Sequence, residues 1–270
     1  MGRVELLSQS PDHGGATESW IIDTTVRNAL RENHRNLRIG VNHPTGTTEP
    51  TDVTVDVTAD YITVEGVGLS SINLTCDLST SGAGGLDTGS IANSTWYYLY
   101  LIASSRAEIY ALLASASATA PTMPAGYHLK RLIGAIRTNG SAKLYRFYFI
   151  EDGWFIFNED LTASPFYSAI AATTTWTTVA QFFPVGAQRV MISAEHDRAG
   201  AAGTCGVAVR PLDSNWAYGS GSLLTRSGGT TKAGAGGNAF PLGTNRQFQI
   251  RSQDAVGEIN WSQVGFWMEV

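Results

Sequence analysis

The sequence predicts a mainly-β protein, with two β-sandwich or jelly-roll-like domains behind a short N-terminal helical or extended segment. Three observations favour this class: only 15% of the residues are charged, glycine is abundant at 29 residues, and several short runs alternate apolar with polar residues. With 43% hydrophobic residues, the 270-residue chain can bury one large core or two smaller ones. We expect the two β-domains to span residues 51–157 and 158–270.

Residues 1–50 are predicted to form an attachment segment, because their pattern differs from the rest of the chain. One amphipathic helix is expected between Asp23 and Leu37. Two prolines and no periodicity in residues 41–50 predict a linker or extended arm after it. The residues expected to dock this segment on a larger assembly are Trp20, Arg27, Leu30 and Arg31.

The first β-domain is predicted from an alternation of period two that begins at Asp52. Val53, Val55 and Val57 share one face. The alternation changes phase near Tyr61, so we expect a turn at residues 58–60 that separates two strands.

Two further patterns extend this domain. Residues 96–102 are apolar at every position, which predicts a strand buried on both faces. Asn139-Gly140 predicts a type I′ hairpin turn, because both residue types tolerate positive φ. The strand that follows this turn is expected to close the domain near Ile150.

The second β-domain is predicted to hold at least five strands, separated by one long glycine-rich loop at 214–243. The expected strands are Trp176–Phe183, Arg189–Glu195, Thr204–Arg210, Arg246–Arg251 and Glu258–Val270.

One stretch of the first domain carries a family resemblance. In order, it contains Gly85-Leu-Asp-Thr-Gly89 followed by Trp96-Tyr-Tyr98, a Pro124-Ala-Gly-Tyr127 loop and the strand Ile133-Gly-Ala-Ile-Arg137. This succession resembles a β-module of tail-fibre and other virion structural proteins of tailed bacteriophages and prophages. The resemblance covers roughly a third of the chain, residues 53–149. It implies a fibre, spike or baseplate-peripheral component that joins the particle or contacts the host envelope, often as a trimer.

Charge and hydropathy limit the expected partners. A net charge of -5 and a pI near 5.5 provide no basic patch for nucleic acid. No signal-peptide core and no run of about 18 apolar residues occurs, so we expect synthesis in the cytoplasm and no membrane span. The resemblance implies that this cytoplasm is that of the host cell and that the protein is located in the virion. The expected partners are other virion proteins, further copies of the chain as a homotrimer, and a host surface glycan. A head or collar decoration protein and a free glycan-binding lectin are the alternatives.

No motif in the sequence supports catalysis, a metal or a cofactor. Glu151-Asp152 and Glu159-Asp160 are adjacent acids, and neighbouring side chains of an extended chain point to opposite faces. Glu195-His196-Asp197 with Ser193 imitates a catalytic triad only in composition. We expect a protein without enzymatic activity.

Three residues of the glycine-rich loop form the candidate ligand site. Trp216 and Tyr218 could stack on a sugar while Asn215 binds a hydroxyl group. The alternative is that both rings cap the end of a sandwich or pack at a subunit interface. Cys76 and Cys205 lie far apart, so no disulfide framework can be read from them, and both are expected to be buried small hydrophobic residues.

Overall fold

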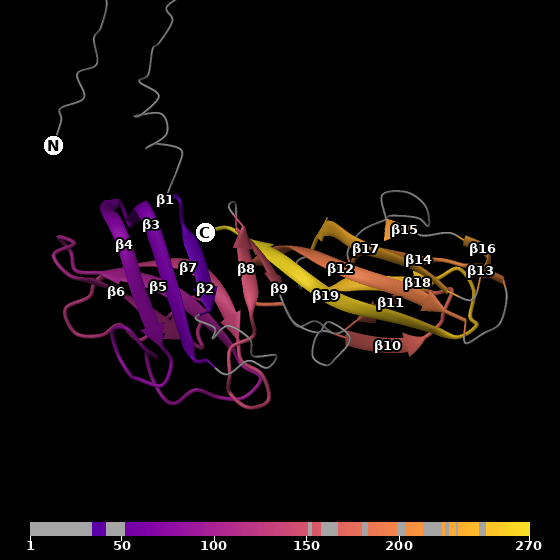
Figure 1. Cartoon of the computed structure of the whole chain (residues 1–270), viewed down its shortest axis with the longest axis horizontal. Coiled ribbons are helices and arrows are strands. Elements are labelled where there is room, and N and C mark those ends of the chain that lie inside the picture. Colours follow the sequence, from indigo (N-terminus) through magenta and orange to yellow (C-terminus); the bar gives the residue numbers. More distant parts are fainter. Residues whose placement is uncertain are drawn as a thin grey trace, which may run out of the picture. The chain divides into compact units, whose positions relative to one another are not determined.

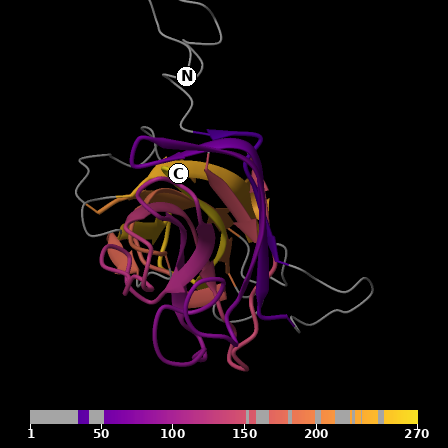
Figure 2. The same cartoon turned by 90° about the vertical axis from the view of Figure 1, so that its left-hand side faces the viewer.

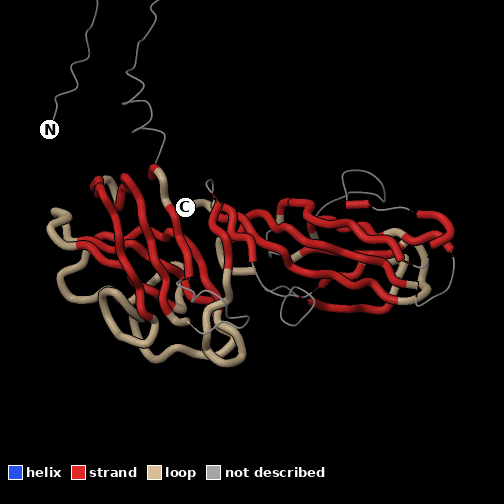
Figure 3. The backbone as a smooth tube through the Cα atoms, viewed as in Figure 1, coloured by secondary structure: helices blue, strands red, loops and turns tan. Residues whose placement is uncertain are grey.

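All regular structure in the described part of the chain is β. The computed structural model describes residues 34–41, 52–150, 153–157, 167–179, 183–198, 203–212, 223–224, 227–230, 232–242 and 247–270. Within these ranges the chain contains strands and loops but no helix, and hence no helix that could cross a membrane (Figure 3). The mainly-β prediction is confirmed at this level, and the strands form several antiparallel sheets.

The first sheet is built on one long hairpin (Figure 1). Strand β3 (Thr54–Val64) pairs along its length with β4 (Val67–Asp77), and β1 (His34–Arg35) and β2 (Arg38–Val41) pair with the other edge of β3. Glu65 and Gly66 connect β3 to β4, with φ of 45° and 84°. Positive φ at both positions marks a type I′ turn, whose twist matches that of the paired strands.

The predicted helix is wrong at its C-terminal end. His34–Arg35 pairs with β3 as a strand, and Asn36 adopts a φ of 52°. Leu37 is buried in the same core as Ile39, so its apolar side chain serves the sheet rather than a helical stripe. Trp20, Arg27, Leu30 and Arg31 lie outside the described residues.

The second sheet has the order β6-β5-β7. It consists of β5 (Trp96–Ala103), β6 (Tyr110–Ser115) and β7 (Leu129–Arg137), and its strands run steeply across those of the first hairpin (Figures 1 and 2). Residues 97–103 of β5 are all buried, which confirms the strand predicted to be covered on both faces.

A six-stranded sheet follows, with the order β17-β12-β19-β9-β8, and β10 also pairs with β19. Its strands are β8 (Phe147–Ile150), β9 (Trp154–Phe157), β10 (Tyr167–Ala171), β12 (Ala187–Asp197), β17 (Lys232–Pro241) and β19 (Glu258–Met268). The strand expected to close the first domain near Ile150 is β8. It pairs with β9, a strand that was not predicted, and β9 also pairs with β19 near the C-terminus.

The remaining strands form two smaller sheets. One has the order β11-β18-β14-β15 and the other pairs β13 with β16. Their bounds are β11 (Thr177–Val179), β13 (Gly203–Cys205), β14 (Val207–Pro211), β15 (Leu223–Leu224), β16 (Ser227–Thr230) and β18 (Phe248–Ser252).

Two sequence predictions about loops need correction. The glycine-rich stretch 214–243 contains β15, β16 and the ten-residue β17, because a β-ladder is bonded through the backbone and needs no large side chain. The turn at Asn139 is not type I′: neither Asn139 nor Gly140 has a positive φ, and Ala142 does. The Asn139 side chain instead accepts hydrogen bonds from the backbone N–H groups of Ser141 and Lys143, at 2.8 and 2.9 Å.

An aromatic junction connects β5 and β7 to the six-stranded sheet. We define it as Trp96, Gly134, Phe155, Phe157 and Phe266. The rings of Phe155 and Phe266 are stacked with centroids 4.9 Å apart, and Trp96 meets Phe266 edge-on at 5.5 Å. A Cβ at Gly134 would lie 2.7 Å from Cζ of Phe155, so only glycine admits this ring. Residues 34–270 form one compact unit.

Candidate binding site

Three neighbouring strands of the first sheet are irregular at the same level. Ala59 pairs with Ile72 and Tyr61 pairs with Ser70, which leaves Asp60 and Ser71 unpaired, with Ser71 at a φ of 55°. Next to them, Asn36 at a φ of 52° separates β1 from β2. We call this line of Asn36, Asp60 and Ser71 the crease.

The crease explains the change of phase in the sequence. The predicted turn at residues 58–60 is wrong, because β3 continues through it as one strand. The register is the same on both sides of Asp60 and Ser71, which lie opposite each other, and one residue in each strand stands outside the alternation, so the inward-facing parity changes in β3 and β4 together. Sequence reasoning found the signal at Tyr61 and assigned it to the wrong structure.

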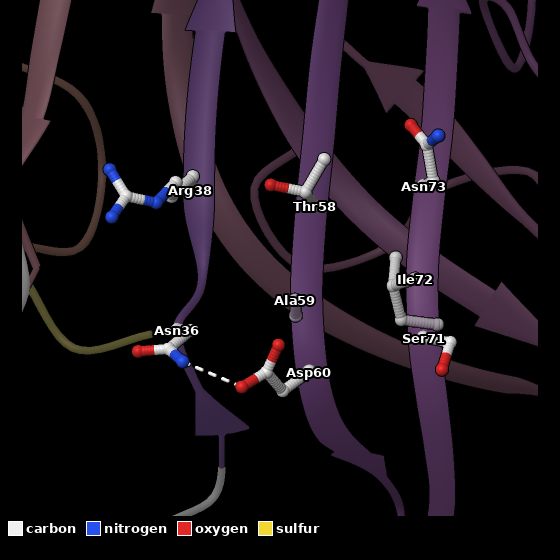
Figure 4. A pocket seen from close by; sticks show the side chains of 8 residues that line it. All are labelled: Asn36, Arg38, Thr58, Ala59, Asp60, Ser71, Ile72 and Asn73. Atoms are coloured by element: carbon white, nitrogen blue, oxygen red, sulfur yellow. Dashed lines mark hydrogen bonds between the residues drawn. The ribbon is translucent and has the colours of Figure 1, made fainter.

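The crease forms a shallow polar hollow of about 500 Å³ on the outward face of the sheet (Figure 4). Asp60 lies in it, where its Oδ2 accepts a hydrogen bond from Nδ2 of Asn36 at 2.6 Å, and Nε of Arg35 lies 3.6 Å away. The lining residues are Asn36, Arg38, Thr58, Ala59, Asp60, Ser71, Ile72 and Asn73.

The hollow offers several kinds of hydrogen-bonding group. Arg38, Thr58 and Asn73 lie in one cross-strand row, and in the described part of the chain no other residue hydrogen-bonds their side chains. A guanidinium only donates, a carboxylate only accepts, and amides and hydroxyls do both. This mixture suits a ligand rich in hydroxyl groups, which also donate and accept.

Metal binding and catalysis receive no support at this site. Among the described residues, no three His, Cys, Asp or Glu side chains lie close enough together to hold a metal ion. Asp60 is the only carboxylate that lines the hollow, whereas general acid and base catalysis of sugar cleavage requires two.

His196 is a structural residue. It is fully buried, its Nδ1 accepts a hydrogen bond from the N–H of Gly206 at 3.2 Å, and its Nε2 lies 2.9 Å from the carbonyl oxygen of Val256. The proton is therefore on Nε2, which donates to Val256. Ser193 lies at the opposite parity of β12 from His196, so the two side chains point to opposite faces of the sheet.

The other predicted site residues are not placed by the structure. Asn215, Trp216, Tyr218 and the acidic pairs Glu151-Asp152 and Glu159-Asp160 lie outside the described residues. Cys76 and Cys205 are both buried, as predicted, and both are free cysteines.

No protein-family model matches this chain, and no curated protein matches it significantly.

Proposed function

We propose that this chain is a non-enzymatic structural protein of a tailed-phage virion, a tail-fibre, spike or baseplate-peripheral component that contacts the host surface. Its β-sheets would form two sandwich modules, the second of jelly-roll type, behind an attachment segment that includes Trp20, Arg27, Leu30 and Arg31. Its partners would be other virion proteins and further copies of the chain in a homotrimer.

The observation that carries the proposal is how the residues of the resemblance are used. Trp96 and Gly134 belong to the aromatic junction, and Arg137 is buried with its guanidinium over the Trp96 ring, 5.5 Å from the centroid. Burial lowers the pKa of Arg137. The residues of the motif therefore pack β5 and β7 against the six-stranded sheet. A rigid connection of this kind supports a structural role in a larger assembly.

Asp87 of the same motif also has a structural role. Its Oδ2 accepts hydrogen bonds from Oγ of Ser115 at 2.6 Å and from the N–H of Thr122 at 2.9 Å. These bonds fix two loops against β6. A carboxylate with its oxygens occupied in this way supports a scaffold role rather than catalysis.

The crease is the candidate contact for a host surface glycan. The side chains of Arg38, Asp60 and Asn73 are exposed on one face of the sheet and come from three different strands. They can therefore form hydrogen bonds with a sugar from several directions. Asn215, Trp216 and Tyr218 remain a second proposed glycan contact.

Location on the particle is tested by labelling intact phage with an antibody against this chain. Label at the tail tip, fibres or baseplate is the expected result. Label at the head or collar would favour a decoration protein. A chain found only in the particle-free lysate would overturn the virion role and favour a free lectin.

The glycan contact is tested on an array of bacterial surface polysaccharides. The double variant Arg38→Ala/Asn73→Ala should bind about thirtyfold more weakly, because two lost hydrogen bonds at about 1 kcal/mol each cost about 2 kcal/mol together. Thr75→Ala is the matched control, since Thr75 is exposed on the same face and does not line the hollow. Equal binding by the double variant and the control would show that the crease is not the contact.

A further inference from the structure

Strands β8, β9 and β19 carry apolar residues on both faces. Their inward residues include Phe155 and Phe266 of the aromatic junction. Their outward residues continue across β12 and β17 in two cross-strand rows, which we call the apolar stripe. The first row is Tyr148, Ile156, Gly265, Met191 and Ala239, and the second is Ile150, Trp154, Trp267, Arg189 and Pro241.

The apolar stripe is open to solvent at its β8 end. Tyr148 is 59% exposed and Ile150 is 52% exposed, the highest values among the large hydrophobic side chains that the structure describes. At a strand spacing of about 4.8 Å, five strands and two rows span roughly 300 Å² of sheet. Within this area Tyr148 and Ile150 are exposed, Trp154, Ile156, Met191 and Trp267 are half-buried, and Gly265 is buried. An exposed apolar patch of a few hundred Å² commonly marks an interaction surface.

The other end of the same outward face is polar. There β12 presents Ser193, Glu195 and Asp197, which pair with Ser262, Asn260 and Glu258 of β19. The outward face of this sheet therefore accepts polar side chains. Folding alone does not require Tyr148, Ile150 and Trp154 to be apolar.

The composition of the stripe is that of an interface centre. Tyr, Trp, Met and Arg are enriched at interface centres, and Lys, Glu and Asp are depleted. The only charge in the stripe is Arg189, whose guanidinium stacks over the ring of Trp267 with 5.5 Å to the centroid.

We propose that the apolar stripe is the centre of an interface with a second copy of this chain. One charge gives little electrostatic complementarity with which to select a different protein. The apolar stripe is exposed from the moment the chain folds, and the partner that is always present at that moment is another newly synthesised copy of the same chain. A stable interface buries about 800 Å² per partner, so the polar residues around the stripe form its rim. This inference does not depend on the virion role.

The first test measures the oligomeric state of the purified full chain by sedimentation at micromolar concentration. The wild type should associate, and Tyr148→Ser/Ile150→Ser should weaken association by at least about tenfold. Ile109→Ser is the matched control, because Ile109 is 47% exposed and lies outside the stripe. Far-UV circular dichroism checks that each variant is folded. A monomeric wild type, or a double variant that associates as well as the control, would overturn the proposal.

A second variant keeps the proposal testable if the double variant misfolds. Ile150→Cys treated with a flexible bifunctional maleimide should form covalent oligomers, whereas Ile109→Cys should remain a monomer. Equal crosslinking of both, or of neither, would overturn the proposal, and so would a wild type that associates only with another virion protein. Antibody labelling of particles reports separately on the virion role.

Discussion

The hairpins β3–β4 and β8–β9 have the same antiparallel pairing but differ in what their outward faces carry. In β3, Val55 and Val57 face the core while Asp56 and Thr58 face outward. In β8 and β9 the residues of both parities are apolar. Folding demands apolar side chains on the inward face of each hairpin. The composition of the outward face is not fixed by folding and therefore carries the information about contacts with other molecules.

The two outward faces are suited to different kinds of contact. The crease on the β3–β4 hairpin presents polar groups that water satisfies until a ligand replaces it, so binding there can be reversible. The apolar stripe across β8 and β9 gains free energy only when it is covered, in proportion to the apolar area removed from water. We therefore expect substitutions at the inward residues, the stripe and the crease to affect different measurements.

The largest effect is expected on the inward face of β9. Phe155→Ala should lower the free energy of unfolding by about 3–5 kcal/mol, because it removes a fully buried ring and leaves a cavity. Chemical denaturation monitored by tryptophan fluorescence measures this change. A loss below about 1 kcal/mol would mean that the aromatic junction is not a tightly packed core.

A smaller loss is expected from the opposite side of the same contact. Gly134→Ala places a Cβ 2.7 Å from Cζ of Phe155, whose ring is held between Gly134 and Phe266. Overpacking of this kind costs about 1–3 kcal/mol. Gly140→Ala is the control, since a Cβ there meets nothing within 4 Å. Equal stability of the two variants would contradict the close approach, and the comparison is made by denaturant titration of both.

The β-rich class of the fold could be predicted from the sequence because burial leaves a pattern of apolar side chains, either at every second position or at every position of a strand. The β-rich class, the doubly buried strand at 96–102 and the two buried cysteines follow from side-chain patterns. The pairing of β9 with β19 could not be predicted, since the paired residues are more than 100 positions apart and the two paired segments, 154–156 and 265–267, are apolar at every position. Strand β17 was missed because its Gly and Ala residues are held by backbone bonds.

The candidate sites depended still more on pairing between distant strands. The crease combines Asn36, Asp60 and Ser71, and each is an ordinary polar residue in the sequence. Only the register of three strands brings them to one level. The phase change at Tyr61 was the available signal, and within a single strand a turn and an unpaired residue change the alternation in the same way.

The pH dependence of the free energy of unfolding should show whether solvent is excluded from the inward face of β4. Burial raises the pKa of the Cys76 thiol from 9.0 to about 12. The unfolded thiol therefore loses its proton from pH 9 upward while the folded one keeps it. The stability that this thiol contributes is complete below pH 9 and is lost as pH rises toward 12, by at most about 1.4 kcal/mol per pH unit.

The measurement compares the wild type with Cys76→Ala between pH 9 and 10. Burial also raises the pKa of Tyr100, from 10.0 to about 12. The pH-dependent loss of stability from Tyr100 therefore begins above pH 10, outside this range. The wild type should lose stability more steeply with pH than the variant. Parallel slopes would show that solvent reaches Cys76.

The smallest effect is expected in the crease itself. Nε of Arg35 lies 3.6 Å from Oδ2 of Asp60, and the two side chains are 63% and 53% exposed. Exposed ion pairs contribute about 0–1 kcal/mol, because water screens the charges and both side chains lose freedom when they pair. Asp60→Asn should therefore leave the free energy of unfolding nearly unchanged, and a double-mutant cycle with Arg35→Ala should give a coupling in that range. A loss above about 2 kcal/mol would show that Asp60 maintains the irregular pairing of β3 and β4. The crease would then be a structural device, and the polar outward face of the first hairpin would no longer mark a binding surface.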